Sequence, residues 1–420
     1  MNRRELAHLT GLFLAVLAAR YVLFTAVGLW GDLGFYTYDA MLINEGQTPF
    51  VDFIGRSPLF NYAFAAVVDW LPVSPVVLLR AFIALWWLLA GVPVYLLGRR
   101  IHSHAGGLAA GAIMQLSPFM LVYGYWTNTQ SLAALLAISG VAILVYREDW
   151  IGFGVAGLAL GIAFLSRRSV ITVLGALGVY ALYQLTQHRE VRSTVFQGVS
   201  VVVGFLAPLG AGYLLLADFD PGLTLAFAET HAWGLISSSG RGGFPLISEA
   251  TPPETSRDLS RGHIPIFHDI CQRCGYWTAR TFAKTSLVTV PIVAPLLFYF
   301  RDITDRYFSD AHRDYTFGVL LALLGYGVYH ALAAGYVIRV GAIISLVLFG
   351  FVAFWSDGID RSVLYDDQMV LLLLVLTSLA AGYLYRNRIL HTYYFLDFMP
   401  YLSVVAGVLY AEAWAVIGDE

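Results

Sequence analysis

The chain has 420 residues, of which 58% are hydrophobic and 13% are charged, and its mean hydropathy is +0.69. Soluble globular chains carry about a quarter charged residues, so this deficit excludes an ordinary soluble protein and indicates that lipid surrounds much of the molecule. The formal net charge of −3, without any basic run, gives no reason to expect a nucleic-acid partner. We therefore predict an all-α polytopic membrane protein.

Apolar stretches of about 20 residues mark candidate transmembrane helices, because that length crosses the hydrocarbon core of a bilayer. The sequence predicts about twelve of them, at residues 8–29, 76–98, 105–124, 128–146, 150–166, 169–186, 195–217, 284–300, 315–335, 338–355, 368–385 and 393–416. The first stretch is too long for a cleaved signal peptide, so we expect a retained signal anchor. Residues 1–420 are then one integral membrane domain.

The arginines set the expected orientation, because basic residues in short loops favour the cytoplasmic side. With the N-terminus inside, more arginines fall in short cytoplasmic segments than in short outer ones. We therefore expect a multi-pass protein of the cell membrane with both termini cytoplasmic. The two long loops, residues 30–75 and 218–283, then face outside.

The first long loop contains three aspartates, Asp32, Asp39 and Asp52. Asp32 and Asp39 are seven residues apart, which is two helical turns, so a helix would present them on one face with Tyr36 between them. Residues 59–72 are amphipathic enough to form an interfacial helix. A carboxylate held there can take a proton from an acceptor hydroxyl during group transfer. Alternatively, the acids simply keep an outer loop polar.

The stretch "DLGFYTYDAMLINEGQTPFVDFIGRSPLFNYAFA" resembles the first outer loop of the GT-C glycosyltransferases that use polyprenyl-phosphate sugars. These include protein O-mannosyltransferases, dolichyl-phosphate-mannose mannosyltransferases and aminoarabinose transferases. The residues that match in order are Asp32, Tyr36, Leu42, Gly46, Pro49, Phe50, Asp52, Arg56, Pro58 and Leu59. Leu33 stands where the family often has a second acid, and Ser57 replaces a proline.

Three further segments resemble the same family. They are the stretch from "LLRAF" to "LVYGYW" in the second and third spans, "GLALGIAFLSRRS" at the fifth, and "RNRILHTYYFLDFMPYL" at the last. The resemblance implies a GT-C-like fold and transfer of a hexose, with mannose favoured, from a dolichyl or polyprenyl phosphate to a lipid-linked or protein-linked glycan. The expected partners are this donor, the glycan acceptor and membrane lipids.

The resemblance also implies roles for individual residues. One of Asp32, Asp39 and Asp52 acts as the general base, with Asp32 favoured, Tyr36 positions the substrate, and the donor carbon inverts. Guanidinium groups bind phosphate well because they donate two parallel hydrogen bonds. The candidates for the donor phosphate and lipid are Arg56, Arg167, Arg168, Arg386, Arg388 and His391.

Arginines at span ends have an alternative role, because they can snorkel to lipid headgroups without binding a substrate. Arg20 differs from them because it lies inside the first span. A charge at the centre of a membrane helix costs about 2.5–3.5 kcal/mol on insertion scales, so Arg20 should face a polar interior or a polar partner.

The second long loop contains a Cys/His cluster formed by His263, His268, Cys271 and Cys274. These residue types are zinc ligands, but all four lie on one short strip, which does not ensure tetrahedral closure. A disulfide and a pair of free thiols are the alternatives. The sequence therefore defines no certain cofactor and leaves a divalent cation open, with zinc, if bound, expected to be structural.

Two other functional classes fit a twelve-helix chain. A secondary transporter would place its ionisable groups near the midplane between two similar halves. Here the charges gather at the outer edge, and the halves do not look alike. A flippase of lipid-linked sugars would share the fold but tolerate loss of Asp32, whereas a transferase would not.

Overall fold

The structure is a computed structural model. It describes residues 3–26, 32–49, 57–68, 72–117, 128–147, 149–186, 191–216, 366–386 and 396–419, with residues 70, 120, 124 and 222. Every regular element within these ranges is helical, which confirms the predicted all-α class. The elements are α1 (Arg3–Ala26), α2 (Asp32–Asn44), α3 (Pro58–Val68), α4 (Pro75–Ile101), α5 (His104–Leu116), α7 (Asn128–Tyr146), α8 (Trp150–Ser166), the 3₁₀ turn η1 (Arg168–Val170), α9 (Ile171–Thr186), α10 (Val191–Leu216), α17 (Asp367–Arg386) and α18 (Met399–Asp419).

Among the described residues, four helices are long and apolar enough to cross a membrane. They are Pro75–Ile101, Thr129–Tyr146, Arg168–Thr186 and Val191–Leu215. The predicted membrane protein is thereby confirmed. The predicted spans 284–300, 315–335 and 338–355 lie outside the described residues, so the count of twelve stays a prediction.

One predicted span is longer than the helix that forms. We expected residues 105–124 to be helical, but α5 ends at Leu116. Ser117 has an extended backbone, with φ −59° and ψ 139°, and it precedes Pro118. Because the ring of a proline crowds the residue before it, that residue is disfavoured in a helix, which accounts for the early end.

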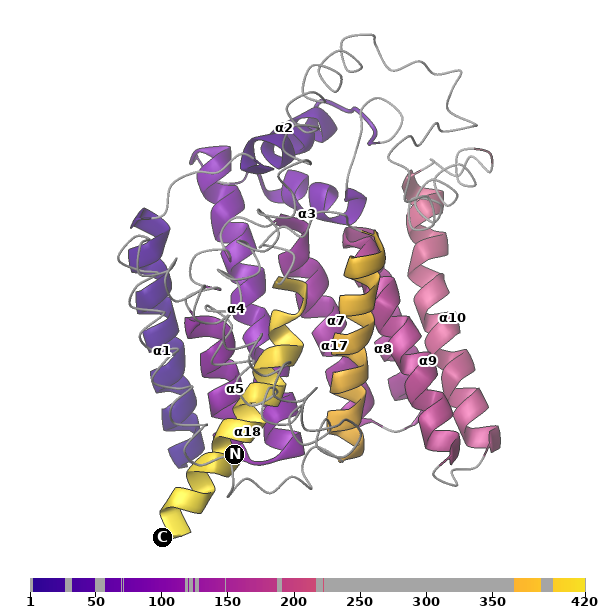
Figure 1. Cartoon of the computed structure of the whole chain (residues 1–420). Coiled ribbons are helices and arrows are strands. Elements are labelled where there is room, and N and C mark those ends of the chain that lie inside the picture. The colour runs from indigo at the N-terminus through magenta and orange to yellow at the C-terminus, as the bar shows by residue number, and fades with distance from the viewer. Residues whose placement is uncertain are drawn as a thin grey trace, which may run out of the picture.

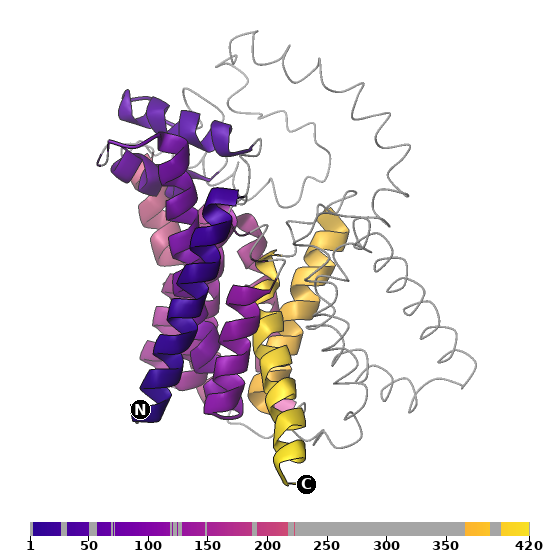
Figure 2. The ribbon, with the colours of Figure 1, turned by 90° about the vertical axis from the view of Figure 1, so that its left-hand side faces the viewer.

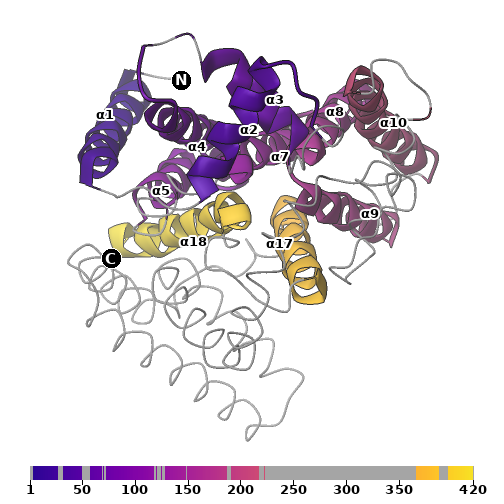
Figure 3. The same cartoon turned by 90° about the horizontal axis from the view of Figure 1, so that it is seen from above.

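The long helices stand side by side, and α2 and α3 lie across one end of them (Figure 1). We call these two helices the α2–α3 cap. Seen from above, α4 and α7 run through the middle of the described helices, with α1 and α5 on one side and α8, α9 and α10 on the other (Figure 3). α18 packs against α5 and α4, and α17 packs against α9. The last helices thus contact the first half of the chain directly.

Aromatic side chains fix the cap onto the bundle. Phe60 and Phe64 of α3 are fully buried, and each has its ring centroid 5.6 Å from that of Phe82 on α4. Phe82 in turn meets Trp86 edge-on at 5.2 Å. Burial of a large apolar side chain stabilises by about 1.5–3 kcal/mol, so this cluster holds α3 in place beneath α2.

α8 and α10 approach each other so closely that glycine is required at the contact. A Cβ atom on Gly157 or Gly161 of α8 would overlap the backbone carbonyl of Val201 or Phe205 on α10. This is the small-residue spacing by which membrane helices bring their backbones together. The packing therefore fixes α8, whose last residue leads into the candidate site.

The beginning of α1 and the end of α18 lie at the same end of the molecule, opposite the cap (Figures 1 and 2). An ion pair and a histidine–carboxylate contact lie there. Arg99 Nη2 is 3.6 Å from Glu5 Oε2, and His102 Nε2 is 2.8 Å from Glu412 Oε1. They join α1 and α18 to the end of α4, so polar side chains link the helices at this end of the bundle.

Candidate functional site

The first polar cluster lies in the cap. Asp32 is the first residue of α2 and Asp39 lies two turns later in the same helix, as the spacing predicts. Asn61 of α3 is fully buried, and its Nδ2 donates a 2.9 Å hydrogen bond to Oδ2 of Asp39. Nδ2 of Asn44 donates to the carbonyl of Ala65 at 3.1 Å. Two side-chain amides thus tie α2 to α3 and hold the Asp39 carboxylate at their contact.

Tyr36 lies between the two aspartates of α2. Its ring is half-buried and meets Phe60 of α3 edge-on, with centroids 5.8 Å apart and planes at 78°. This contact continues the aromatic cluster that anchors the cap, so the ring of Tyr36 is held in a defined orientation. Its expected role in positioning substrate stays a prediction.

The second cluster joins residues 230 positions apart. Nε of Arg167 lies 2.7 Å from Oδ2 of Asp397, and Oγ of Ser169 donates to the same oxygen at 3.0 Å. The side chains of Arg167 and Asp397 are only 17% and 7% exposed. Removal of one partner of a largely buried ion pair strongly destabilises a protein, because the other charge is left buried without compensation.

Local backbone structure brings these groups together. α8 ends at Ser166, and Arg167 has an extended backbone, with φ −156° and ψ 120°, before the short turn η1. Asp397 lies in the turn that precedes α18, and Pro400 is the second residue of that helix. Proline is favoured in the first turn of a helix because no backbone N–H is needed there. The junction of α8 and α9 therefore meets the start of α18.

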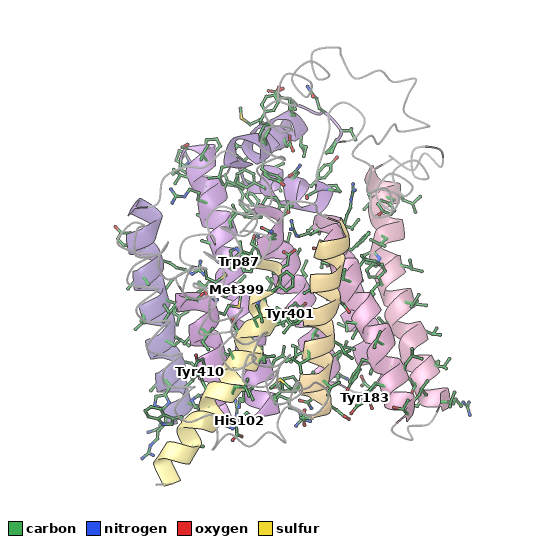
Figure 4. The ribbon with its side chains drawn as sticks, viewed as in Figure 1. Trp87, His102, Tyr183, Met399, Tyr401 and Tyr410 are labelled. Atoms are coloured by element: carbon green, nitrogen blue, oxygen red, sulfur yellow. The ribbon has the colours of Figure 1, made fainter. Side chains whose placement is uncertain are left out.

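A small cavity of about 20 Å³ adjoins the ion pair. The cavity is lined by Ala133, Ala134 and Ala137 of α7, Arg167, Ser169, Val170 and Val173 around η1, Leu379 of α17, and Asp397 and Tyr401 near the start of α18. Tyr401 is almost fully buried, and its hydroxyl has no hydrogen-bond partner among the described residues. Met399 and Tyr401 lie nearer the cap than His102 and Tyr410 do (Figure 4). The cavity therefore lies in the cap-side part of the bundle.

The structure places some of the predicted residues in two groups. Asp32, Tyr36 and Asp39 lie on α2, and Arg167 and Arg168 directly follow α8, against which α3 of the cap packs. Arg386 is the last residue of α17, about two turns beyond the cavity residue Leu379. The remaining predicted residues lie outside the described residues: Asp52, Arg56, His263, His268, Cys271, Cys274, Arg388 and His391.

Four residues of these clusters were not predicted from the sequence, namely Asp397, Ser169, Asn44 and Asn61. Asp397 stands in the apolar stretch "YYFLDFMPYL", where an acid needs a polar or charged partner, so its setting was a usable signal. Asn61 and Ser169 carry no comparable signal, since a single amide or hydroxyl in an apolar helix is common. For the described residues, no group of three or more His, Cys, Asp or Glu side chains could hold a metal ion.

The fold and these clusters define a helical integral membrane protein with polar groups gathered on the cap side of its bundle. Residues 56–210 match the model of a protein family described as dolichyl-phosphate-mannose-protein mannosyltransferase. The match runs from α3 into α10 and includes Arg167 and Arg168. It confirms the predicted resemblance over that part of the chain.

Solved structures are similar to the chain over nearly its whole length. The oligosaccharyltransferase of Archaeoglobus fulgidus in its apo form is 14% identical, with a TM-score of 0.45, over 98% of this chain and 55% of its own. ArnT from Cupriavidus metallidurans bound to undecaprenyl phosphate is 13% identical, with a TM-score of 0.45, over 97% of this chain and 76% of its own. The chain thus spans about half the length of the oligosaccharyltransferase. No curated protein sequence matches it.

Proposed function

We propose that the protein is a membrane glycosyltransferase that moves a hexose, with mannose favoured, from a dolichyl or polyprenyl phosphate to a glycan. The glycan acceptor is linked to a lipid or to a protein. The single observation that carries this proposal is the match of residues 56–210 to the mannosyltransferase family. That segment contains the adjacent arginines 167 and 168, which suit a phosphate-bearing donor.

In the proposed reaction, a carboxylate of the first loop takes the proton of the acceptor hydroxyl. The acceptor oxygen forms a bond to the anomeric carbon while the bond from that carbon to the phosphate oxygen breaks, and its electron pair leaves with the lipid phosphate. Attack opposite the leaving group inverts the carbon. Asp32 is the favoured base, and Asp39, held by Asn61, is the alternative on the same helix.

The leaving phosphate gains negative charge as the bond breaks, so cationic groups near it lower the barrier. We assign this role to Arg167 and Arg168, which directly follow the cap-side end of α8. Arg386 at the end of α17 is a third candidate. In this proposal the cap side faces outside and both termini are cytoplasmic. The two described chain ends lie at the same end of the molecule, which supports their being on one side of the membrane (Figure 2).

The test is mass analysis of lipid-linked and protein-linked glycans in cells that lack the gene, restored with wild type or with Asp32→Asn. We expect glycans one hexose short after deletion, with accumulation of a sugar-charged polyprenyl phosphate. Wild type should restore them, and Asp32→Asn should not. Asp149→Asn is the matched control because Asp149 is an exposed acid of the turn between α7 and α8 and lies outside both clusters.

Three outcomes would contradict the proposal or the role of Asp32 in it. Unchanged glycans in the deleted cells would favour a secondary transporter. Full rescue by Asp32→Asn would exclude Asp32 as the base. Rescue equal to that of wild type by the double variant Asp32→Asn, Asp39→Asn would favour a flippase of lipid-linked sugars.

A further inference from the structure

The ion pair between Arg167 and Asp397 presents an electrostatic problem for an anion site. A carboxylate close to a bound phosphate repels it, and the repulsion is strong where water is scarce. Asp397 is 92% buried, and its Oδ2 accepts hydrogen bonds from both Arg167 and Ser169. An acid in this position weakens phosphate binding through its charge alone, so any favourable contribution has to come from the geometry it imposes on Arg167.

The hydrogen bond to Asp397 is made through Nε of Arg167. A guanidinium group is planar and carries its five N–H donors in a rigid fork. A bond at Nε therefore fixes the plane of the fork and the direction of the two terminal nitrogens. Ser169 strengthens this restraint because its hydroxyl holds the accepting oxygen from a second side at 3.0 Å.

The size of the adjoining cavity shows on which side of Asp397 a phosphate could bind. The cavity of about 20 Å³ has room for about one water molecule, and a phosphate group is several times larger. Three alanines and two valines make up half of the residues that line it. A phosphate group is therefore too large for this cavity, and we place its contact with Arg167 outside the cavity.

We propose that Asp397 is a positioning residue that orients Arg167 toward the phosphate of a polyprenyl-phosphate ligand. This inference rests on the proposed function and adds a residue from the start of α18 to the donor site. Asp397 acts through Arg167 and does not touch the ligand. Because Asp397 is 230 residues from Arg167 in the chain, the donor site requires both the α8–α9 junction and the last helix.

The test measures binding of undecaprenyl phosphate to the full chain in nanodiscs. We expect Asp397→Asn to raise the Kd about tenfold, within the range of coupling between contacting residues. Arg167→Ala should raise the Kd at least as much. The double variant should bind no more weakly than Arg167→Ala alone, because Asp397 then has no arginine to orient and only its repulsion of the phosphate is removed. Asp397→Glu, which keeps the charge, should recover part of the affinity.

Ser403→Ala is the matched control, because Ser403 is a fully buried polar residue of α18 that lies outside the cavity lining. It should leave the Kd unchanged. Thermal unfolding of each variant separates folding from binding: a lower unfolding temperature with an unchanged Kd for Asp397→Asn would show a purely structural residue and overturn the inference.

A tighter Kd for Asp397→Asn would also overturn the inference, because it would show that the charge of Asp397 opposes the phosphate. Both results presuppose that the wild type binds the lipid. Absence of saturable binding by the wild type would instead overturn the proposed function together with the inference, so the two failures are distinguishable.

Discussion

Nη2 of Arg20 donates a 2.7 Å hydrogen bond to Oε1 of Gln115, and Nε2 of Gln115 donates to the carbonyl of Trp87 at 2.7 Å. The side chains of Arg20 and Gln115 are both buried. A cation inside α1 is therefore linked through α5 to α4. This confirms that Arg20 faces a polar partner, which is the arrangement that a charge within a membrane helix requires.

Replacement of Gln115 by methionine should destabilise the protein. Methionine has a similar volume but removes the acceptor for Arg20 and the donor to Trp87. A lost hydrogen bond to a charged group costs about 1.5–3 kcal/mol when the partner stays buried. The measurement is the unfolding temperature in detergent. The double variant Arg20→Met, Gln115→Met should recover part of the loss, since no buried charge is then left; a larger loss would contradict this account.

Two glycines of α10 should respond in opposite directions to the same change. A Cβ atom on Gly204 would overlap the backbone carbonyl of Gly154 on α8, whereas Gly210 has no neighbour within 4 Å. Gly204→Ala should destabilise by about 1–3 kcal/mol, because the backbones have to separate. Gly210→Ala should leave stability unchanged or raise it by up to about 1 kcal/mol, since alanine is the better helix former. Equal effects in thermal unfolding would exclude close packing as the cause.

Helix positions were largely predictable from the sequence because a membrane helix needs a long apolar run. α7 and α8 coincide with the predicted spans 128–146 and 150–166. The early end of α5 was not predicted, although Pro118 after Ser117 is a local signal that outweighs hydropathy. Hydropathy records the cost of lipid contact and carries no information on the backbone preference of the residue before a proline.

The hydrogen bond from Asn61 to Asp39 allows stability and activity to be tested separately. Asn61→Leu removes the donor to the Asp39 carboxylate, and Asn44→Leu removes the donor to the carbonyl of Ala65. Asn61→Leu should lower stability by about 1.5 kcal/mol, near the low end for bonds to charged groups, because Asp39 is partly exposed. Under the proposed function, transfer per folded molecule should fall for Asn61→Leu and stay near wild type for Asn44→Leu. Equal transfer by both variants would exclude Asp39 from the reaction.

The candidate site was less predictable than the helices. Arg167 and Arg168 could be selected because arginines at the outer end of a span are exceptions to the positive-inside bias. The contact of Arg167 with Asp397 depends on how α18 packs against the first half of the chain, and no local pattern carries that information. A pair of residues 230 positions apart is specified by tertiary packing, which a single sequence read segment by segment does not provide.

The turn between α7 and α8 should show a defined dependence on acid. Asp149 caps α8 by accepting a 2.7 Å hydrogen bond from the backbone N–H of Gly152, and Arg147 Nη2 lies 3.0 Å from its other oxygen. The hydrogen bond from Gly152, followed by that from Arg147, lowers the pKa of Asp149 below its ordinary value of 3.8. A lowered pKa in the folded state means that this carboxylate stabilises the fold fully above the unfolded value. The stabilisation begins to be lost when the pH falls below 3.8, the ordinary pKa, and it is gone once the pH lies below the lowered pKa of the folded state.

The pH dependence can be isolated with Asp149→Asn, because asparagine is also a good N-cap but does not titrate. The unfolding temperature of the wild type minus that of the variant should be constant from pH 7 to about 4.5, and it should fall below pH 4, where only the wild type loses a charge. Other carboxylates titrate in the same range, but they do so in both proteins and cancel in the difference. A difference that stays constant down to pH 3 would show that the capping bond is as strong with a protonated acid as with a carboxylate.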